Sequence, residues 1–411
     1  MTITIFLANA LGATAARVST RVLVFCLVAT NVSAQGPASG PCAEMATVPA
    51  PVAEALDRFL HSTIDPEAPR SPVEGYGTGA VLSVTGPGWR YVRAVGVIAP
   101  ESDVPMTCDM PYQIGSATKM MTATVLLQLH EEGALSVDDL LSAHLPDTAA
   151  ALPNGDVITL RQLANHTAGV FDYTNNAPDG TPGVMVGDLS DSAMMSIGYT
   201  PAALVAFAVD HGEPTFAPGA EGAWLYSNTG YVLMGQIIER ITAKPLESVL
   251  EERIFGPLGM SDSFLWSDVP RPHFGLPRSF FTPPFEIEST DWNMSQGWAA
   301  GAVISTVDDM SVFIAALLEG QLFDDRTTLD IMQDTVPTGR SLMPQYGIGL
   351  IEISPGLWGH GGQTLGFVSD TAYIPQENVS IVAWTNSARS IAGHAGLEVS
   401  TILKLSGIIP E

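Results

Sequence analysis

The stretch IGSATKMMTATVLLQLHEEG, residues 114–133, is the part of the sequence on which the fold assignment rests. Its middle is almost entirely apolar, and it ends at Gly133, the residue type that commonly closes a helix. We therefore predict a long buried helix over residues 116–132. Lys119 lies inside this helix, although the whole chain has only three lysines. Because burying an ammonium group is costly, its position calls for a specific reason.

Ser116 supplies that reason, since it precedes Lys119 by three residues. Residues three apart on a helix share one face at about 5–6 Å, so an amine would lie beside a hydroxyl. A neighbouring amine can take the serine proton and activate a weak nucleophile. At a helix start, the unpaired backbone N–H of Ser116 can also stabilise an oxyanion. The alternative is that Ser116 only caps the helix, because S-x-x-K occurs often by chance.

Two further elements follow along the chain. The first is Y-S-N at residues 226–228, just before a predicted helix, and the second is H-G-G at residues 360–362. The second lies between two strand-like runs, residues 346–353 and 366–374. Each has an ordinary explanation, because the tyrosine can be a core residue, the asparagine a helix cap and the glycines a tight turn. Only their order and their combination with S-x-x-K make them informative.

Strand patterns gather at the two ends of the chain, whereas the middle is mainly helical. This distribution predicts an α/β (α+β) fold, in which an antiparallel sheet from both chain ends is flanked by helices and carries an inserted helical lobe. We expect a sheet lobe over 51–115 plus 340–405, a helical lobe over 116–339, and a substrate cleft between them. The elements expected for the sheet lobe are helices 52–60 and 392–405 and strands 79–84, 90–98, 346–353, 366–374 and 379–385.

The ordered motifs resemble the serine β-lactamase-related family, in the branch of class C β-lactamases, D-alanyl-D-alanine carboxypeptidases, D-aminopeptidases and related esterases. That branch carries S-x-x-K, Y-x-N and K/H-x-G, and the likeness covers about residues 50–400. The resemblance implies a β-lactamase/transpeptidase-like fold and an acyl-enzyme mechanism without metal or cofactor. Supporting segments are Ile158 to Leu163, Asn165 to Gly169, Pro218-Gly219, Tyr226 to Tyr231, Pro257 to Met260 and Gly359 to Gly362.

The resemblance also implies residue roles. Ser116 would attack a carbonyl, with Lys119 and Tyr226 sharing the acid and base work. Asn228 would hydrogen-bond either the substrate amide or the Lys119 amine. His360 would supply polarity or positive charge near Tyr226. Gly362 belongs to the same motif, and the N–H of Gln363, expected on the strand after the glycines, would complete the oxyanion hole with that of Ser116.

One departure bears on the substrate. Many family members carry Thr or Ser where this chain has Gly361, which offers no hydroxyl to a substrate carboxylate. A lost charge-assisted hydrogen bond costs about 1.5–3 kcal/mol, which weakens the carboxypeptidase and lactamase interpretations. Gln363 or a loop arginine, Arg271 or Arg278, could compensate; both arginines could equally be surface charges.

The N-terminus has the pattern of a signal peptide, with Arg17 and Arg21 before the apolar run 22–30. We predict cleavage after Ala34, export to a periplasm or the medium, and a linker over 35–50. An uncleaved anchor or a later start codon remain alternatives. In an oxidising compartment, Cys42 and Cys108 are then expected to form a disulfide, the alternative being two separate buried thiols.

Charge narrows the possible partners. With 17 Lys+Arg against 43 Asp+Glu, the net charge is −26, which argues against nucleic acid and against stable association with anionic membranes. The partner expected is a small-molecule or peptide substrate, and the oligomeric state stays open. An α/β-hydrolase is disfavoured, because G-x-S-x-G is absent.

The sequence therefore predicts an exported serine hydrolase acting on D-amino-acid peptides, amides or small esters. The alternatives are a true β-lactamase and a catalytically silent binding or scaffold protein.

Overall fold

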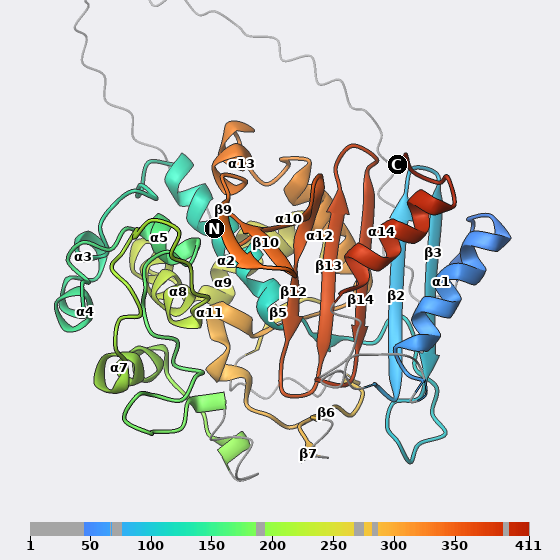
Figure 1. Cartoon of the computed structure of the whole chain (residues 1–411), viewed down its shortest axis with the longest axis horizontal. Coiled ribbons are helices and arrows are strands. Elements are labelled where there is room, and N and C mark those ends of the chain that lie inside the picture. Colours follow the sequence, from blue (N-terminus) through green and yellow to red (C-terminus); the bar gives the residue numbers. More distant parts are fainter. Residues whose placement is uncertain are drawn as a thin grey trace, which may run out of the picture. The chain divides into compact units, whose positions relative to one another are not determined.

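A nine-stranded antiparallel sheet, ordered β1-β3-β2-β14-β13-β12-β11-β10-β9, is the central feature of the computed structural model (Figure 1). The structure describes residues 45–65, 67, 76–185, 194–266, 275–281, 287–388 and 394–410, all within the unit 40–411. The strands are β1 (Met45–Ala46), β2 (Gly79–Gly86), β3 (Trp89–Gly96), β9 (Val336–Arg340), β10 (Met343–Tyr346), β11 (Ile351–Ser354), β12 (Leu357–Gln363), β13 (Val368–Ile374) and β14 (Val379–Thr385).

The middle of this sheet is buried on both faces. In β14, Ile381 and Ala383 belong to the core shared with α1 (Ala50–Ser62) and α14 (Ala395–Leu405), whereas Trp384 points into the larger core on the opposite face. This alternation is the period of two that a strand imposes on its side chains. Figure 1 shows α14 lying across the sheet with α1 beside β3. The expected antiparallel sheet flanked by helices is confirmed.

The opposite face of the sheet carries α2 (Thr118–Glu131) and α12 (Val307–Leu318), which join it to the helical part of the chain. The predicted helix 116–132 is thus present, but its first turn is a 3₁₀ turn, η1 (Gly115–Ala117). The other helices are α3 (Leu141–His144), α4 (Pro146–Ala151), α5 (Leu160–Ala164), α7 (Pro201–His211), α8 (Asn228–Thr242), α9 (Leu246–Leu250), α10 (Gly256–Leu258), α11 (Trp298–Gly301) and α13 (Thr327–Met332).

Short elements complete the described part of the chain. A three-stranded sheet, ordered β4-β8-β5, holds the start of η1 against the loop before α12. The short elements are β4 (Tyr112–Gln113), β5 (Phe264–Leu265), β6 (Phe280–Phe281), β7 (Ile287–Glu288), β8 (Val303–Ser305), the 3₁₀ turns η2 (Met194–Ser196) and η4 (Met294–Gln296), and the π-helical turn η3 (Glu251–Phe255).

The strand expected over 346–353 is wrong, because the chain turns between β10 and β11. Gly349 adopts φ +71°, in the left-handed region that favours glycine. A Cβ on Gly349 would lie 2.8 Å from the carbonyl oxygen of Lys119, so this turn packs directly against α2. Extended strand pairing therefore stops at Tyr346 and resumes at Ile351.

The start of the fold also differs from expectation. Residues 45–46 form β1, which pairs with β3, and α1 begins at Ala50, so the predicted linker 35–50 does not extend to its expected end. The predicted signal peptide, residues 1–34, and Cys42 lie outside the described residues. Cys108 is buried, with 1% of its surface exposed, and its disulfide to Cys42 stays a prediction.

Candidate active site

Ser116 and Lys119 lie together at the junction of η1 and α2. The Lys119 side chain is fully buried, and its Nζ donates to Ser116 Oγ at 3.1 Å, Asn228 Oδ1 at 2.7 Å and the Ala300 carbonyl at 2.6 Å. These three acceptors match the three donors of an ammonium group. Ser116 is only half-buried, whereas the Lys119 amine is excluded from solvent. The hydroxyl is therefore the more accessible of the two groups to a substrate.

Burial controls the charge of Lys119. Loss of solvent lowers its pKa to about 7, although the negative charge of Asp172 acts in the opposite direction. The rings of Tyr226 and Tyr231 lie 4.8 Å and 5.2 Å from Nζ, and their faces favour the charged form. Near neutral pH the amine is therefore divided between its two forms, and the neutral form can accept the Ser116 proton.

This pKa predicts an acid limb in the pH profile of hydrolysis. Only the neutral amine accepts a proton, so the rate should rise as pH increases through about 7 and level off above it. The profile should be measured as kcat/KM between pH 5 and pH 9, a range that flanks this value by about two pH units on either side. A rate that is constant from pH 5.5 to pH 8.5 would exclude Lys119 as the base.

Tyr226 places its phenol beside Ser116. Its hydroxyl is buried and has no hydrogen-bond partner of normal geometry among the described residues. Burial is the largest influence and raises the pKa of Tyr226 well above its usual range, while the nearby Ser116 side chain lowers it. The phenol thus keeps its proton at working pH, which suits it to relaying a proton rather than to acting as the initial base.

Asn228 is the first residue of α8, and both ends of its amide are engaged. Its Oδ1 accepts from Lys119, and its Nδ2 donates to Asp172 Oδ2 at 3.1 Å. Of the two partners that the sequence left open, the structure thus shows the Lys119 amine. Asp172, which is buried, was missed by the sequence reasoning. The sequence feature that could have drawn attention to Asp172 is its position between two aromatic residues, Phe171 and Tyr173.

The sequence left polarity and positive charge open for His360, and the lowered pKa of its ring favours polarity. Desolvation and the neighbouring Lys119 charge lower its pKa to about 3. Its Nδ1–H donates to the Gly361 carbonyl at 2.5 Å, which leaves Nε2 to accept from the Tyr346 hydroxyl at 3.0 Å. The ring centroids of His360 and Tyr226 are 6.3 Å apart, so the residue contributes polarity there.

Gln363 was expected on the strand after the glycines. In the structure it is instead the last residue of β12, the strand that contains the glycines. Close packing requires a glycine at position 362 of this strand, because a Cβ there would lie 1.8 Å from the Ile114 carbonyl oxygen. The Thr364 N–H donates to the Phe367 carbonyl. Because successive N–H groups along a strand point to opposite sides, the Gln363 N–H points away from β13. A Cβ on Gly115 would lie 2.7 Å from that nitrogen, which places it beside the Ser116 turn.

These elements bring a nucleophile, a buried amine, a phenol and two candidate oxyanion donors to one place. In a comparison with known protein families, the Beta-lactamase family model matches residues 70–402, a range that contains all of these groups. The chain belongs to the Beta-lactamase family.

Solved members of similar fold support the assignment. A D-stereospecific amidohydrolase from Streptomyces sp. is 31% identical with a TM-score of 0.67, covering 84% of this chain and 97% of that one. A D-amino acid amidase from Ochrobactrum anthropi SV3 is 26% identical with a TM-score of 0.71, covering 87% and 98%. The β-lactamase/transpeptidase-like fold and the serine hydrolase class are therefore confirmed.

Curated relatives match over shorter regions. The D-alanyl-D-alanine-carboxypeptidase/endopeptidase AmpH of Escherichia coli (strain K12) is 25% identical over 320 residues, which are 74% of this chain and 77% of that protein. The match to another relative, from Bacillus subtilis (strain 168), spans 62% of that protein's length.

Ring side chains pack around Tyr226 in the site of this Beta-lactamase family member. His166 has φ +65° and is buried, and its ring centroid lies 4.3 Å from that of Tyr226. Its Nδ1 accepts the Ser227 N–H at 3.2 Å, which holds the backbone between Tyr226 and Asn228. Trp224 and Tyr346 pack around the same ring at 5.6 Å and 4.6 Å. Sequence reasoning used the His166 segment only for the resemblance.

The remaining candidates lie elsewhere or outside the described residues. Arg278 is exposed, and its Nε donates to Glu288 Oε1 at 2.7 Å, so it is a surface ion pair. Arg271 lies outside the described residues. Within the described ranges, no group of three or more His, Cys, Asp or Glu could hold a metal ion, and no helix is long and apolar enough to cross a membrane.

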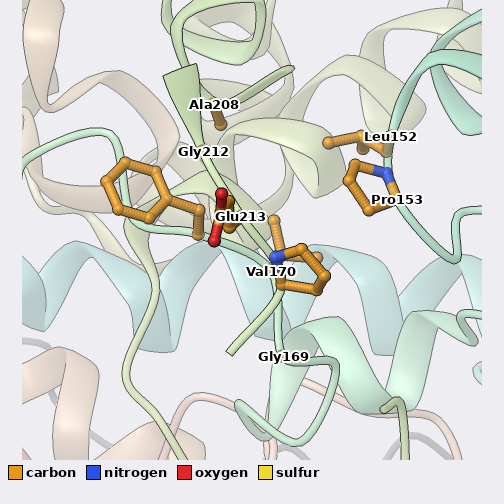
Figure 2. A pocket seen from close by; sticks show the side chains of 9 residues that line it. Leu152, Pro153, Gly169, Val170, Ala208, Gly212 and Glu213 are labelled. Atoms are coloured by element: carbon orange, nitrogen blue, oxygen red, sulfur yellow. The ribbon is translucent and has the colours of Figure 1, made fainter. Parts of the chain in front are cut away.

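Figure 2 shows a pocket that is lined by residues 152–153, 169–171, 208 and 212–214. Its volume of about 10 Å³ suits roughly one water molecule, and none of the Ser116, Lys119 or Tyr226 side chains faces it. It is too small to receive a substrate of this family.

Proposed function

We propose that this Beta-lactamase family member is an exported serine hydrolase that forms an acyl-enzyme on Ser116 with D-amino-acid amides, D-peptides or small esters. The observation that carries the proposal is the 3.1 Å contact between Ser116 Oγ and a fully buried Lys119 amine. Burial lowers the pKa of this amine to about 7, which matches a general base at neutral pH.

In the proposed reaction, Ser116 Oγ attacks the substrate carbonyl carbon and passes its proton to neutral Lys119. The carbonyl oxygen becomes an oxyanion that the N–H groups of Ser116 and Gln363 stabilise. The tetrahedral intermediate then expels the amine or alcohol, which receives the proton through Tyr226. Water attacks the acyl-enzyme, loses its proton to the same groups and releases the acid, which restores Ser116.

Two considerations support D-configured amides or small esters as substrates. The solved relatives with 31% and 26% identity are a D-stereospecific amidohydrolase and a D-amino acid amidase, whose names specify D-configured substrates. Gly361 removes the hydroxyl that would bind a carboxylate next to the scissile bond, and Arg278 is already paired with Glu288. Substrates without that carboxylate, such as amides and esters, lose less binding energy in such a site.

The test is intact-protein mass spectrometry with benzylpenicillin, run beside hydrolysis of D-alanyl p-nitroanilide, p-nitrophenyl acetate and nitrocefin. L-Alanyl p-nitroanilide is the stereochemical control. Hydrolysis of the D-anilide or the ester, with an acyl adduct on Ser116, supports the proposal. Fast nitrocefin turnover with a short-lived adduct would make the chain a β-lactamase instead. No adduct and no hydrolysis would favour a catalytically silent binding protein.

Export is supported by the arginines and apolar run at the N-terminus. Expression of the full chain in a bacterial host, followed by N-terminal sequencing of the periplasmic and secreted fractions, tests it. A mature end at Gln35 is the expected result, whereas intact protein retained in the cytoplasm would contradict it.

A further inference from the structure

Asp172 is a buried acid held rigidly against the start of α8. Only 4% of its surface is exposed, and the Thr174 N–H donates to its Oδ1 at 3.1 Å. The residues before and after it, Phe171 and Tyr173, both hydrogen-bond Thr229. The Thr229 Oγ1 donates to the Phe171 carbonyl at 2.7 Å and accepts the Tyr173 N–H at 3.2 Å. The backbone around Asp172 is thus anchored independently of the Asp172 side chain.

The Asp172 carboxylate determines which way the Asn228 amide faces. A carboxylate only accepts hydrogen bonds, so it requires the Nδ2 group, which lies 3.1 Å from Oδ2 and 3.4 Å from Oδ1. The Oδ1 of Asn228 is then left for the Lys119 amine at 2.7 Å. A flipped amide would set donor against donor at Lys119 and acceptor against acceptor at Asp172. Either clash would leave a buried polar group without a hydrogen-bond partner, which disfavours the flipped amide.

Asp172 is also the acid whose charge reaches Lys119. The other titratable groups that face the amine are Tyr226 and Tyr231, whose pKa values are raised by burial, and His166 and His360, whose pKa values are lowered. All four are therefore neutral near pH 7. The Asp172 charge opposes the desolvation of the Lys119 ammonium. Burial raises the pKa of Asp172, while the hydrogen bonds from Thr174 and the Lys119 charge act in the opposite direction and favour its ionised form.

We propose that Asp172 is a positioning residue for the hydrolytic reaction: it orients the Asn228 amide toward Lys119 and serves as the counter-charge of that amine. Asp172 does not reach the substrate; it acts through Asn228 and Lys119. This inference rests on the proposed function, because Lys119 must be the base for its orientation to matter.

The first experiment compares Asp172→Asn with wild type and with Asp138→Asn, an exposed member of the Arg161 ion pair that serves as the matched control. We expect Asp172→Asn to slow acylation of Ser116 by a fluorophosphonate about ten- to a hundredfold, the size of one hydrogen bond to a charged group. The acid limb should move about one pH unit lower, because losing the negative charge favours neutral Lys119. Asp138→Asn should change neither.

An Asn228→Ala background separates positioning from general damage. If Asp172 acts through Asn228, Asp172→Asn should slow acylation by less than about threefold once Asn228 is absent. If the double variant instead loses the product of the two single-variant rate losses, the positioning role is overturned. It is also overturned if Asp172→Asn slows acylation no more than Asp138→Asn does.

An activity-free measurement keeps the two proposals distinguishable. With three lysines in the chain, ¹³Cε-lysine labelling gives one NMR signal per lysine, and the signal lost in Lys119→Met belongs to Lys119, whose pKa burial lowers to about 7. Asp172→Asn should lower that titration midpoint, and an unchanged midpoint would overturn the counter-charge role. If wild-type Ser116 is never acylated, the proposed function fails, while this titration still decides whether Asp172 and Lys119 are coupled.

Discussion

Replacing Ser116 with alanine is expected to abolish acyl transfer, with kcat falling by about 10⁴-fold or more. No other described hydroxyl is seen bonded to Lys119, so the loss of Oγ leaves the base with no alcohol to activate. The fold should persist, because η1 has no side-chain cap and the Ser116 hydroxyl contributes no other bond to it. Loss of activity would then report chemistry rather than stability.

Steady-state hydrolysis of the substrate identified for wild type measures this effect, with thermal unfolding as the check on folding. Ser311→Ala is the matched control, since among the described residues that hydroxyl bonds only the Val307 carbonyl within α12. It should retain full activity. If Ser116→Ala keeps more than about 1% of wild-type kcat, the acyl group is carried by another residue and the proposed mechanism is wrong.

Replacing Lys119 with methionine is expected to reduce kcat by about 10²- to 10⁴-fold, the usual contribution of a general base. Methionine fills the same buried, elongated volume without an amine. The reaction that remains should lose the acid limb near pH 7, because the group responsible for it is gone. A pH profile that keeps this limb would assign it to a different residue.

Lys244→Met provides the control for this change. Lys244 is exposed and pairs with Glu252 at 2.6 Å on the surface, so its loss should leave both the rate and the pH profile unchanged. Stoichiometric labelling of Ser116 in Lys119→Met should become slow rather than absent, because the hydroxyl itself remains. Near-wild-type turnover in Lys119→Met would exclude the S-x-x-K mechanism.

Local spacing explains why the centre of the site could be predicted from the sequence. Ser116 and Lys119 are three residues apart on a helical turn, and that geometry does not depend on the rest of the fold. The likeness of the Y-S-N and H-G-G motifs to a known family supplied the remaining candidates. The strands at both chain ends were likewise visible as runs of strand-forming residues.

What the sequence could not supply depends on burial and on distant partners. The Asp172 carboxylate is one of 43 acids, and only the folded chain places it against Asn228, 56 residues away. The charge of His360 follows from desolvation, which no motif encodes. Strand β12 was not predicted because glycines have poor strand propensity, and only the folded chain shows that the Ile114 carbonyl leaves no room for a side chain at Gly362.

The pairing of β2 with β14 has a consequence for how the protein matures. Thr85 lies opposite Ser380, so the centre of the sheet joins a segment that is synthesised earlier to one that is synthesised much later. Such non-local pairing closes slowly and requires the last strands to have left the ribosome. Gln363, the proposed second oxyanion donor, arrives with those strands. A nascent chain therefore contains Ser116 well before the strand that brings Gln363 has been made, so the proposed site forms late in synthesis.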